Sequence, residues 1–425
     1  MRPGADAAVS QWLDWLETLH PAEIELGLER TAAVADRLGL RDAAVPIITV
    51  AGTNGKGSVC AFLEAILAAA GWRVGLYTSP HLERFHERVR AAGNEIDDTA
   101  LRASLAAVDA AREETPLTFF EFTTLAAVQH FRATDVDVMV LETGLGGRLD
   151  ATNVFAADVA VISSIGVDHA EWLGTDRNDI AREKAGIARA GRPLVVAEAD
   201  LPTAWDDIVA ATAAAEIRQG RDYSAQLEAG GETWCWRQRN HVRHGLPLPV
   251  LAGGYQLANA AAAVTALTAL RGVPPEPAAL AAGLRWAHVP ARFEILPGSV
   301  ETILDVGHNP QAAAALARSL RERGGAGRTL GLIGVQADKD VEGIVAALAD
   351  VFDAWYCVTL PPPRGRDAAS LAAHVRAAIA PDVAVQAYDE PVMAAEAVRA
   401  AAAVGDRVVV TGSFSTVARM RGHFL

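Results

Sequence analysis

The segment IITVAGTNGKGS at residues 47–58 joins a β-branched run to a glycine loop that carries one lysine. The β-branched run predicts a buried strand, and the alanine- and leucine-rich pattern at 58–70 predicts a helix. In a strand–loop–helix arrangement, backbone N–H groups and the helix N-terminus face an anion, and the lysine adds a positive charge. The segment therefore predicts a phosphate cradle, and the expected ligand is a nucleoside triphosphate.

The spacing of this loop departs from the usual G-x-x-x-x-G-K-[ST] pattern, because Gly57 lies between Lys56 and Ser58. The alternative interpretation is a glycine-rich turn with a solvated lysine. Other motifs of the chain are needed to distinguish a phosphate cradle from such a turn.

The length and composition restrict the class of protein. A chain of 425 residues exceeds what one hydrophobic core usually supports, so we expect two domains. The net charge of −14 argues against nucleic acid or an anionic membrane surface as the main partner. No apolar run approaches the ~18 residues of a membrane helix, and the N-terminus lacks the apolar core of a signal peptide. The three cysteines form no C-x-x-C pair, so neither disulfides nor a zinc site is indicated. We expect a cytoplasmic protein.

Predicted strands and helices alternate along the first half of the chain. After a helical segment at 10–40, the predicted strands are 47–50, 73–77, 136–142, 158–165 and 193–197. The predicted helices between them are 58–70, 99–114, 119–133 and 178–190. Apolar strands separated by helices predict an α/β fold with a mostly parallel sheet, covered on both faces.

The pattern changes at 217–251, where short polar and aromatic runs predict hairpins or an irregular insertion. Two helices, 256–271 and 276–286, and a linker at 288–292 follow. Alternation then restarts, with strands near 301–306, 329–334, 355–358, 383–387 and 407–411. The helices of this part are expected near 311–323, 341–351, 368–379, 391–403 and 414–421. We therefore predict domains at 1–290 and 291–425.

Two candidate ligand groups follow strands of the first domain. Glu142 ends the strand 136–142, and His169 follows the strand 158–165. Parallel strands bring both residues to the same edge of the sheet as Lys56, which is where open α/β sheets bind ligands. An acid beside a phosphate loop often holds Mg²⁺. The alternatives are a turn acid and a hydrogen-bonded histidine of the core.

Lys184 lies on the apolar face of the predicted helix 178–190. At 100° per residue it shares a stripe with Ile180 and Ile187, whereas Arg182 and Arg189 lie on the opposite face. Such a lysine usually snorkels or pairs with an acid. If it is buried, its pKa falls, and a neutral amine can add carbon dioxide to form a metal-binding carbamate.

Strand ends of the second domain also carry polar residues. They lie in the segments 305–310, 338–340 and 411–415. Each is a weak signal alone, because strand–turn–helix junctions often collect such residues. Together they suggest that both domains present strand ends to one cleft.

These motifs occur in the order seen in folylpolyglutamate synthases. The matching segments are AGTNGKGS (51–58), TSPHL (78–82), FFEFTT (119–124), ETGLGGRLDATN (142–153), DHAEWLGTDRNDIAREKAGI (168–187), RFE (292–294), DVGHNP (305–310), DKD (338–340) and GSFSTVA (412–418). The chain resembles most closely the bacterial family of bifunctional dihydrofolate synthase/folylpolyglutamate synthases. This family belongs with the Mur ligases. The resemblance covers nearly the whole chain, and the block at 142–187 is highly specific.

The resemblance implies a fold and a set of site residues. The fold is a P-loop-containing central domain of the Mur ligase type, followed by a smaller Rossmann-like α/β domain, with ATP and substrates between them. The implied ATP-binding residues are Thr53, Asn54, Gly55, Lys56, Gly57, Ser58, Asn259, Arg292 and Asp305. The implied Mg²⁺ ligands are Ser79, Glu142, His169 and Lys184 as its carbamate, and Lys56, His169 and Lys184 are the implied catalytic residues. The implied contacts of the pterin substrate are Glu23, Ile24, Glu25, Leu26, Thr118, Phe119, Phe120, Glu121, Leu149, Asp150 and Ala151.

The implied reaction is ATP-dependent amide formation through an acyl phosphate. L-Glutamate would be joined to dihydropteroate and to the terminal glutamate of reduced folates by what we expect to be a monomer. Three alternatives differ from this reading: a synthase active only on folates, a peptidoglycan Mur ligase and a non-catalytic ATP-binding regulatory module. The short run before Gly52 leaves no room for the N-terminal domain that peptidoglycan Mur ligases need. A regulatory module would not explain Lys184 beside Glu142 and His169.

Overall fold

The computed structural model describes the whole chain except residues 1, 5, 23, 42–44, 273 and 326. The described chain divides into two compact units. The first unit consists of Met1–Val167, Glu171–Val250 and Leu257–His288. The second unit consists of Asp168–Ala170, Leu251–Gln256 and Val289–Leu425.

The first unit is built on a mixed sheet that has eight strands in the part of the chain described. Their order across the sheet is β4 (Asn94–Glu95), β3 (Val89–Ala91), β2 (Val74–Tyr77), β5 (Val138–Glu142), β1 (Ile47–Ala51), β6 (Val159–Ile162), β7 (Pro193–Val196) and β8 (Ala215–Arg218). Strands β2, β5, β1, β6, β7 and β8 pair in parallel. Strands β3 and β4 pair antiparallel at one edge of the sheet. The predicted parallel sheet is confirmed, and β3, β4 and β8 were not predicted.

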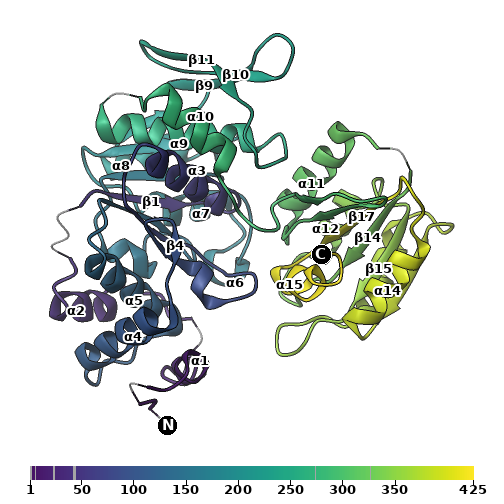
Figure 1. Cartoon of the computed structure of the whole chain (residues 1–425), viewed down its shortest axis with the longest axis horizontal. Coiled ribbons are helices and arrows are strands. Elements are labelled where there is room, and N and C mark those ends of the chain that lie inside the picture. The colour runs from purple at the N-terminus through teal and green to yellow at the C-terminus, as the bar shows by residue number, and fades with distance from the viewer. Residues whose placement is uncertain (1, 5, 23, 42–44, 273, 326) are drawn as a thin grey trace. The chain divides into compact units, whose positions relative to one another are not determined.

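Helices cover both faces of this sheet. Up to residue 288 they are α1 (Val9–Leu16), α2 (Glu29–Arg37), α3 (Lys56–Ala69), α4 (Asp98–Arg112), α5 (Phe119–Ala133), α6 (Ala170–Leu173), α7 (Arg177–Ala185), α8 (Trp205–Thr212), α9 (Gln256–Arg271) and α10 (Pro277–Trp286). Short 3₁₀ helices occur at η1 (Phe85–Arg88) and η2 (Ala151–Val154). Helices α3, α9 and α10 lie on one side of the sheet, and α2, α4 and α5 lie on the other (Figure 1). The helical segment predicted at 10–40 is broken between α1 and α2.

The irregular segment predicted at 217–251 forms a separate antiparallel sheet. Its strands are β9 (Tyr223–Leu227), β10 (Thr233–Gln238) and β11 (His241–Pro247). β11 packs against α10 (Figure 1). The prediction of hairpins in this segment is confirmed.

The second unit is also an α/β sheet structure. Its strand order is β12 (Glu294–Leu296), β13 (Glu301–Leu304), β17 (Arg407–Thr411), β14 (Thr329–Ile333), β15 (Ala354–Val358) and β16 (Ala384–Tyr388). Its helices are α11 (Pro310–Arg323), α12 (Val341–Leu348), α13 (Ala368–Ala378), α14 (Pro391–Ala401) and α15 (Phe414–Arg421). All strands pair in parallel except β12, which directly follows the predicted linker and was missed. Among the described residues, no helix combines the length and the apolar character needed to cross a membrane.

Candidate active site

The glycine loop begins where the central strand β1 ends. Gly52 has φ +156 and Gly55 has φ +84, a region that favours glycine. A Cβ at Gly52 would lie 1.9 Å from Oγ of Ser163, and one at Gly55 would lie 2.7 Å from Oδ1 of Asn259. Both positions therefore need glycine for their conformation and for the close approach of a neighbouring side chain. The structure places Asn259 next to the loop, and its predicted contact with ATP stays a prediction.

Hydrogen bonds to the segment after β6 hold the loop in place. Ser163 Oγ donates to the carbonyl of Asn54 over 2.6 Å, and the N–H of Asn54 donates to Ser164 Oγ over 2.8 Å. Thr53 Oγ1 donates to the carbonyl of Gly166 over 2.8 Å. Because β1 and β6 are parallel neighbours, their carboxyl ends lie at one edge of the sheet. Three hydrogen bonds therefore connect the loop to the segment that follows β6.

Lys56 is the first residue of α3, so the loop leads directly into a helix N-terminus. Its Nζ donates to the carbonyl of Gly52 over 3.0 Å and thus folds back over the loop. Ser58 is buried in the first turn of the helix. A lysine and a helix N-terminus on a glycine loop form the arrangement that binds phosphate groups.

Glu142 ends β5 and is only 3% exposed. The N–H of Ser79, which follows β2, donates to Oε2 of Glu142 over 3.3 Å. β2 and β5 are parallel neighbours, so their ends deliver both residues to one place. A Cβ at Gly57 would lie 3.8 Å from the same Oε2 atom, which places the carboxylate beside the start of α3. Two of the four predicted metal ligands therefore lie together next to the glycine loop.

The donor atoms of this pair fit Mg²⁺. A serine hydroxyl and a carboxylate are hard oxygen ligands, which this ion prefers, and phosphate oxygens can complete its coordination. His169 has φ +51 and lies in the segment Asp168–Ala170, which belongs to the second unit. Its role as a ligand stays a prediction.

Lys184 is 3% exposed and lies on α7. The adjacent residues Ile180 and Ala181 belong to the core that β6 and β7 share with this helix. The apolar-face position predicted for Lys184 is confirmed, and the burial on which its predicted reactivity depends is observed. Carbamylation of Lys184 stays a prediction.

The loop after Glu142 packs tightly on the end of α7. The N–H of Arg148 donates to the carbonyl of Glu183 over 2.7 Å, and a Cβ at Gly147 would lie 2.8 Å from that carbonyl. A Cβ at Gly186 would lie 2.3 Å from Cβ of Arg148. Gly147 and Gly186 therefore allow the 142–153 loop to contact the helix that carries Lys184.

Asp150 organises the same loop from inside. Its Oδ2 accepts the N–H groups of Gly144 (2.8 Å) and Leu145 (2.9 Å), and its Oδ1 accepts the Thr152 hydroxyl (2.6 Å). Burial raises the pKa of Asp150, and these hydrogen bonds oppose that rise. The structure thus gives Asp150 a role in shaping the loop. The predicted substrate contacts of Leu149, Asp150 and Ala151 stay predictions.

The predicted pterin-binding residues at 118–121 form the N-terminus of α5. Thr118 and Glu121 make a capping box, in which each side chain accepts the other residue's backbone N–H. Glu121 is buried and also pairs with Arg30, whose other partner is Glu25. The structure therefore connects the two predicted substrate segments, 24–26 and 118–121, through one arginine. Glu23 lies outside the described residues.

Arg88 was missed by the sequence reasoning. Its guanidinium lies 5.6 Å from the ring centre of Phe85 and 5.7 Å from that of Phe119, and its Nε donates to Nδ1 of His81 over 2.8 Å. Burial lowers the pKa of Arg88, and the charges of Tyr77 and Glu142 oppose this. A partly buried cation thus lies near the predicted metal-binding carboxylate. A charged residue in a 3₁₀ turn gives no periodic signal from which this environment could be predicted.

In the second unit, Asp305 is buried after β13. Its carboxylate accepts the N–H groups of Phe293 (3.0 Å) and Gly307 (2.8 Å). Burial raises the pKa of Asp305, and the charge of Arg292 opposes this. The guanidinium of Arg292 lies 5.5 Å from the ring centre of Phe414. Arg292 and Asp305 therefore lie near each other, as their common predicted role requires.

A second polar cluster of this unit surrounds Asp168. Lys339 Nζ donates to its Oδ1 over 2.7 Å, Asn309 Nδ2 donates to its Oδ2 over 3.0 Å, and Nε2 of His308 lies 3.3 Å from Oδ2. Burial acts to raise the pKa of Asp168, but His308 and Lys339 hold it below its ordinary value. The motifs at 168, 305–310 and 338–340 thus meet at one place in the fold.

Comparison with protein-family models gives two matches. The Mur ligase middle domain matches residues 50–267. The glutamate ligase domain of Mur ligases matches residues 291–414. Together the two models cover most of the chain, including the glycine loop, Glu142, Lys184 and Asp305.

Several known proteins are similar over nearly the full length. The Escherichia coli dihydrofolate synthase/folylpolyglutamate synthase is 43% identical over 418 residues, which is 98% of this chain and 96% of that protein. The Mycobacterium tuberculosis protein of the same name is 33% identical over 96% of this chain and 91% of its own. The structure of Escherichia coli FolC in complex with DHPP and ADP superposes with a TM-score of 0.93 at 42% identity, covering 99% and 98% of the two chains.

A Yersinia pestis folylpolyglutamate synthase/dihydrofolate synthase complexed with AMPPNP and Mn ion has a TM-score of 0.91 at 42% identity, and 99% of each chain is covered. These similarities extend over both units of the fold. The chain belongs to the Mur ligase family, among the dihydrofolate synthase/folylpolyglutamate synthases.

Proposed function

We propose that this chain is an ATP-dependent ligase that joins L-glutamate to dihydropteroate and to the terminal glutamate of reduced folates. The observation that carries the proposal is the position of the Ser79–Glu142 pair beside the glycine loop of Lys56. The 43% identity to a bifunctional enzyme over 98% of the chain supports both activities.

The first step is phosphoryl transfer from ATP to the substrate carboxylate. Lys56 and the N-terminus of α3 hold the phosphate groups and stabilise the charge that develops on the transferred group. Ser79 and Glu142 would hold Mg²⁺, whose positive charge would stabilise the negative charge of the phosphate groups. The remaining predicted ATP contacts are Thr53, Asn54, Gly55, Gly57, Ser58, Asn259, Arg292 and Asp305.

In the second step the amine of L-glutamate attacks the acyl phosphate. The carbon–oxygen bond to the phosphate breaks, inorganic phosphate leaves with one oxygen of the former carboxylate, and the amine loses a proton. The protein has to hold the amine close to the acyl phosphate, an advantage on the order of 10⁵ M or more in effective concentration. It also has to exclude water, which would hydrolyse the intermediate.

Buried Lys184 has a separate part in this proposal. With 3% exposure, its side chain is removed from bulk solvent, and addition of carbon dioxide to the amine would form a carbamate. The resulting carbamate would supply a further anionic oxygen ligand, together with His169, Ser79 and Glu142. The loop contacts of Arg148 with Glu183 hold the helix that positions it.

The assignment of substrate segments, partners and domains is also part of the proposal. The pterin would meet the residues at 24–26, 118–121 and 149–151, and the domains would be 1–290 and 291–425. We propose a cytoplasmic monomer whose partners are small molecules: dihydropteroate, reduced folates and L-glutamate.

An assay of both acceptors side by side tests the bifunctional activity. The purified protein is given ATP, Mg²⁺ and labelled L-glutamate, with either dihydropteroate or a reduced folate as the acceptor. Incorporation of label into both products is expected. Incorporation of labelled L-glutamate into the folate but not into dihydropteroate would show a folylpolyglutamate synthase without dihydrofolate synthase activity.

A further inference from the structure

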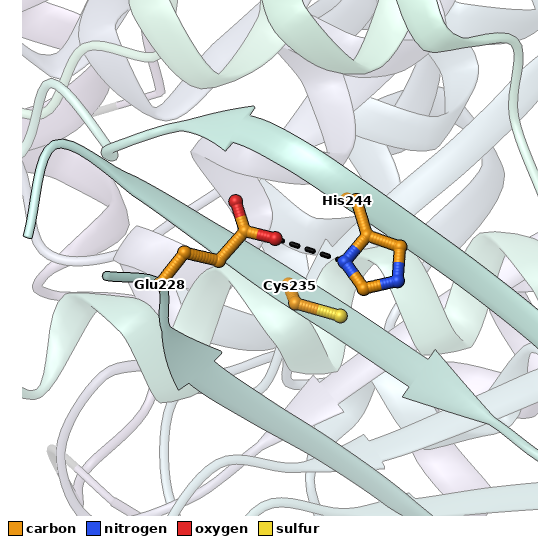
Figure 2. Close-up of side chains that lie close together, drawn as sticks. All are labelled: Glu228, Cys235 and His244. Atoms are coloured by element: carbon orange, nitrogen blue, oxygen red, sulfur yellow. Dashed lines mark hydrogen bonds and ion pairs between the residues drawn. The ribbon is translucent and has the colours of Figure 1, made fainter. Parts of the chain in front are cut away.

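A cluster of three metal-ligand side chains lies on the antiparallel sheet β9–β11, far along the chain from every active-site motif. Glu228 follows β9, Cys235 is in β10 and His244 is in β11. A carboxylate oxygen, the thiol sulfur and a ring nitrogen all lie within 4.8 Å of one another. Figure 2 shows the three side chains close together, with a hydrogen bond between Glu228 and His244.

The strand pattern explains why Cys235 faces outward. Its neighbours Trp234 and Trp236 are fully buried, and side chains alternate between the two faces of a strand. Cys235 therefore points to the face opposite the tryptophans. Among the three cysteines, all of which lie in the described part of the chain, it is the one that is not buried.

A β-bulge brings His244 to the same place. Trp234 pairs with Leu246 and Trp236 pairs with Arg243, so two residues of β11, His244 and Gly245, lie opposite Cys235 alone. Gly245 has φ +65, as expected of the glycine in such a bulge. The extra residue directs the imidazole toward the thiol.

The carboxylate of Glu228 is held in position by the same bulge. Its Oε2 accepts the Thr233 hydroxyl over 2.8 Å and the N–H of Gly245 over 3.0 Å. Its Oε1 lies 2.9 Å from Nδ1 of His244. One oxygen therefore fixes the side chain while the other faces the imidazole. Three ligand atoms are thus preorganised by backbone geometry.

We propose that Glu228, Cys235 and His244 bind one zinc ion, with water as the fourth ligand. Thiolate, imidazole and carboxylate are the three side-chain ligand types of Zn²⁺, which prefers four ligands in a tetrahedron. A thiolate is a soft ligand that suits Zn²⁺ and not Mg²⁺, so this donor set discriminates against the ion expected at the active site. The ion replaces the hydrogen bond between Glu228 and His244, and the thiol proton is released.

The bound ion links all three strands of the small sheet. Since the site would be formed in the folded protein and not in the unfolded chain, zinc binding stabilises the folded state. The proposal does not depend on the ligase activity, because none of the three residues belongs to the predicted active site.

A zinc titration of the full-length, metal-stripped protein tests the site. The titration is carried out by calorimetry in excess Mg²⁺, which occupies sites made of oxygen ligands, and is repeated with Co²⁺ to record thiolate-to-cobalt absorption. We expect one zinc ion per chain, a thiolate absorption band with Co²⁺ and a rise in the melting temperature with Zn²⁺.

Loss of a residue that contacts a metal ligand, and not the metal itself, lowers metal affinity roughly 10- to 100-fold. Cys235→Ser and His244→Ala remove ligands, so each should lower the affinity for zinc by more than this. The exposed side chain of His244 makes its replacement compatible with folding. His241→Ala, on the same strand, is the matched control and should bind zinc like the parent. No zinc binding by the parent protein, or binding unchanged in both ligand variants, would overturn the proposal.

Discussion

The backbone N–H of Ser79 donates a hydrogen bond to Oε2 of Glu142 over 3.3 Å. This contact joins the ends of β2 and β5 at the place where the glycine loop enters α3. We predict that Glu142→Gln raises the Mg²⁺ concentration needed for half-maximal activity by at least about 10- to 100-fold, since a charged ligand is lost. Magnesium titrations of phosphate release measure this. Glu113→Gln, an exposed acid on α4's C-terminal side, serves as the control, and an unchanged magnesium requirement in Glu142→Gln would contradict the assigned role.

Lys184→Ala should abolish most turnover while leaving the fold intact. Removal of the amine removes the site of the carbamate, and a short carboxylate added to the buffer can occupy part of the space with a similar anionic oxygen. We therefore expect partial rescue by formate or acetate, measured as ATP- and glutamate-dependent product formation. Arg182→Ala, on the opposite face of α7, is the matched control. Full activity of Lys184→Ala without any added acid would show that a carbamate of Lys184 is not needed for the reaction.

Arg30→Ala should lower the free energy of unfolding by about 1–3 kcal/mol, because the carboxylate of Glu121 stays buried without its ion-pair partner. The double variant Arg30→Ala/Glu121→Gln should recover part of this loss, since a glutamine retains the capping box and carries no charge. Urea unfolding of the two single variants and the double variant gives the coupling. Strictly additive effects would show that the pair contributes nothing.

The stability of the first unit should depend on pH through His130. Burial lowers the pKa of His130 below its ordinary value of 6.5, and the charge of Asp97 opposes this. Below pH 6.5 the unfolded chain therefore binds more protons than the folded one. The contribution of neutral His130 to the free energy of unfolding is fully present above pH 6.5. It is lost as the pH falls toward the lowered pKa of His130 in the folded protein. His130→Gln should make the free energy of unfolding fall less steeply with decreasing pH, as measured by urea titrations. Equal slopes in both proteins would contradict this.

The strands that position the site could be predicted because each is a short apolar run that ends in a turn. β1, β5 and β6 have this pattern, and the parallel pairing follows from the helices between them. Lys184 was identified because one charged residue interrupts an apolar helical stripe, and its burial confirms that inference. The short strands β3, β4, β8 and β12 were missed, since their side chains lack a sustained alternation of period two.

The positions of two arginines could not be predicted in the same way. Arg30 and Arg88 lie outside any periodic pattern, and each is partly covered by aromatic or acidic groups distant in sequence. The cluster on β9–β11 was missed for a related reason. Cys235 and His244 belong to different strands and Glu228 follows a third, and the bulge opposite Cys235 brings them together. The pairing register of β10 and β11 cannot be predicted from the spacing of these residues in the sequence.

The proposed mechanism activates the substrate carboxylate as an acyl phosphate. Dihydropteroate labelled with ¹⁸O in its carboxylate should transfer one labelled oxygen to the inorganic phosphate released in the presence of ATP, Mg²⁺ and L-glutamate. Mass spectrometry of that phosphate measures the transfer. We expect phosphate with one ¹⁸O per amide bond formed. Unlabelled phosphate accompanying amide formation would show that no acyl phosphate forms.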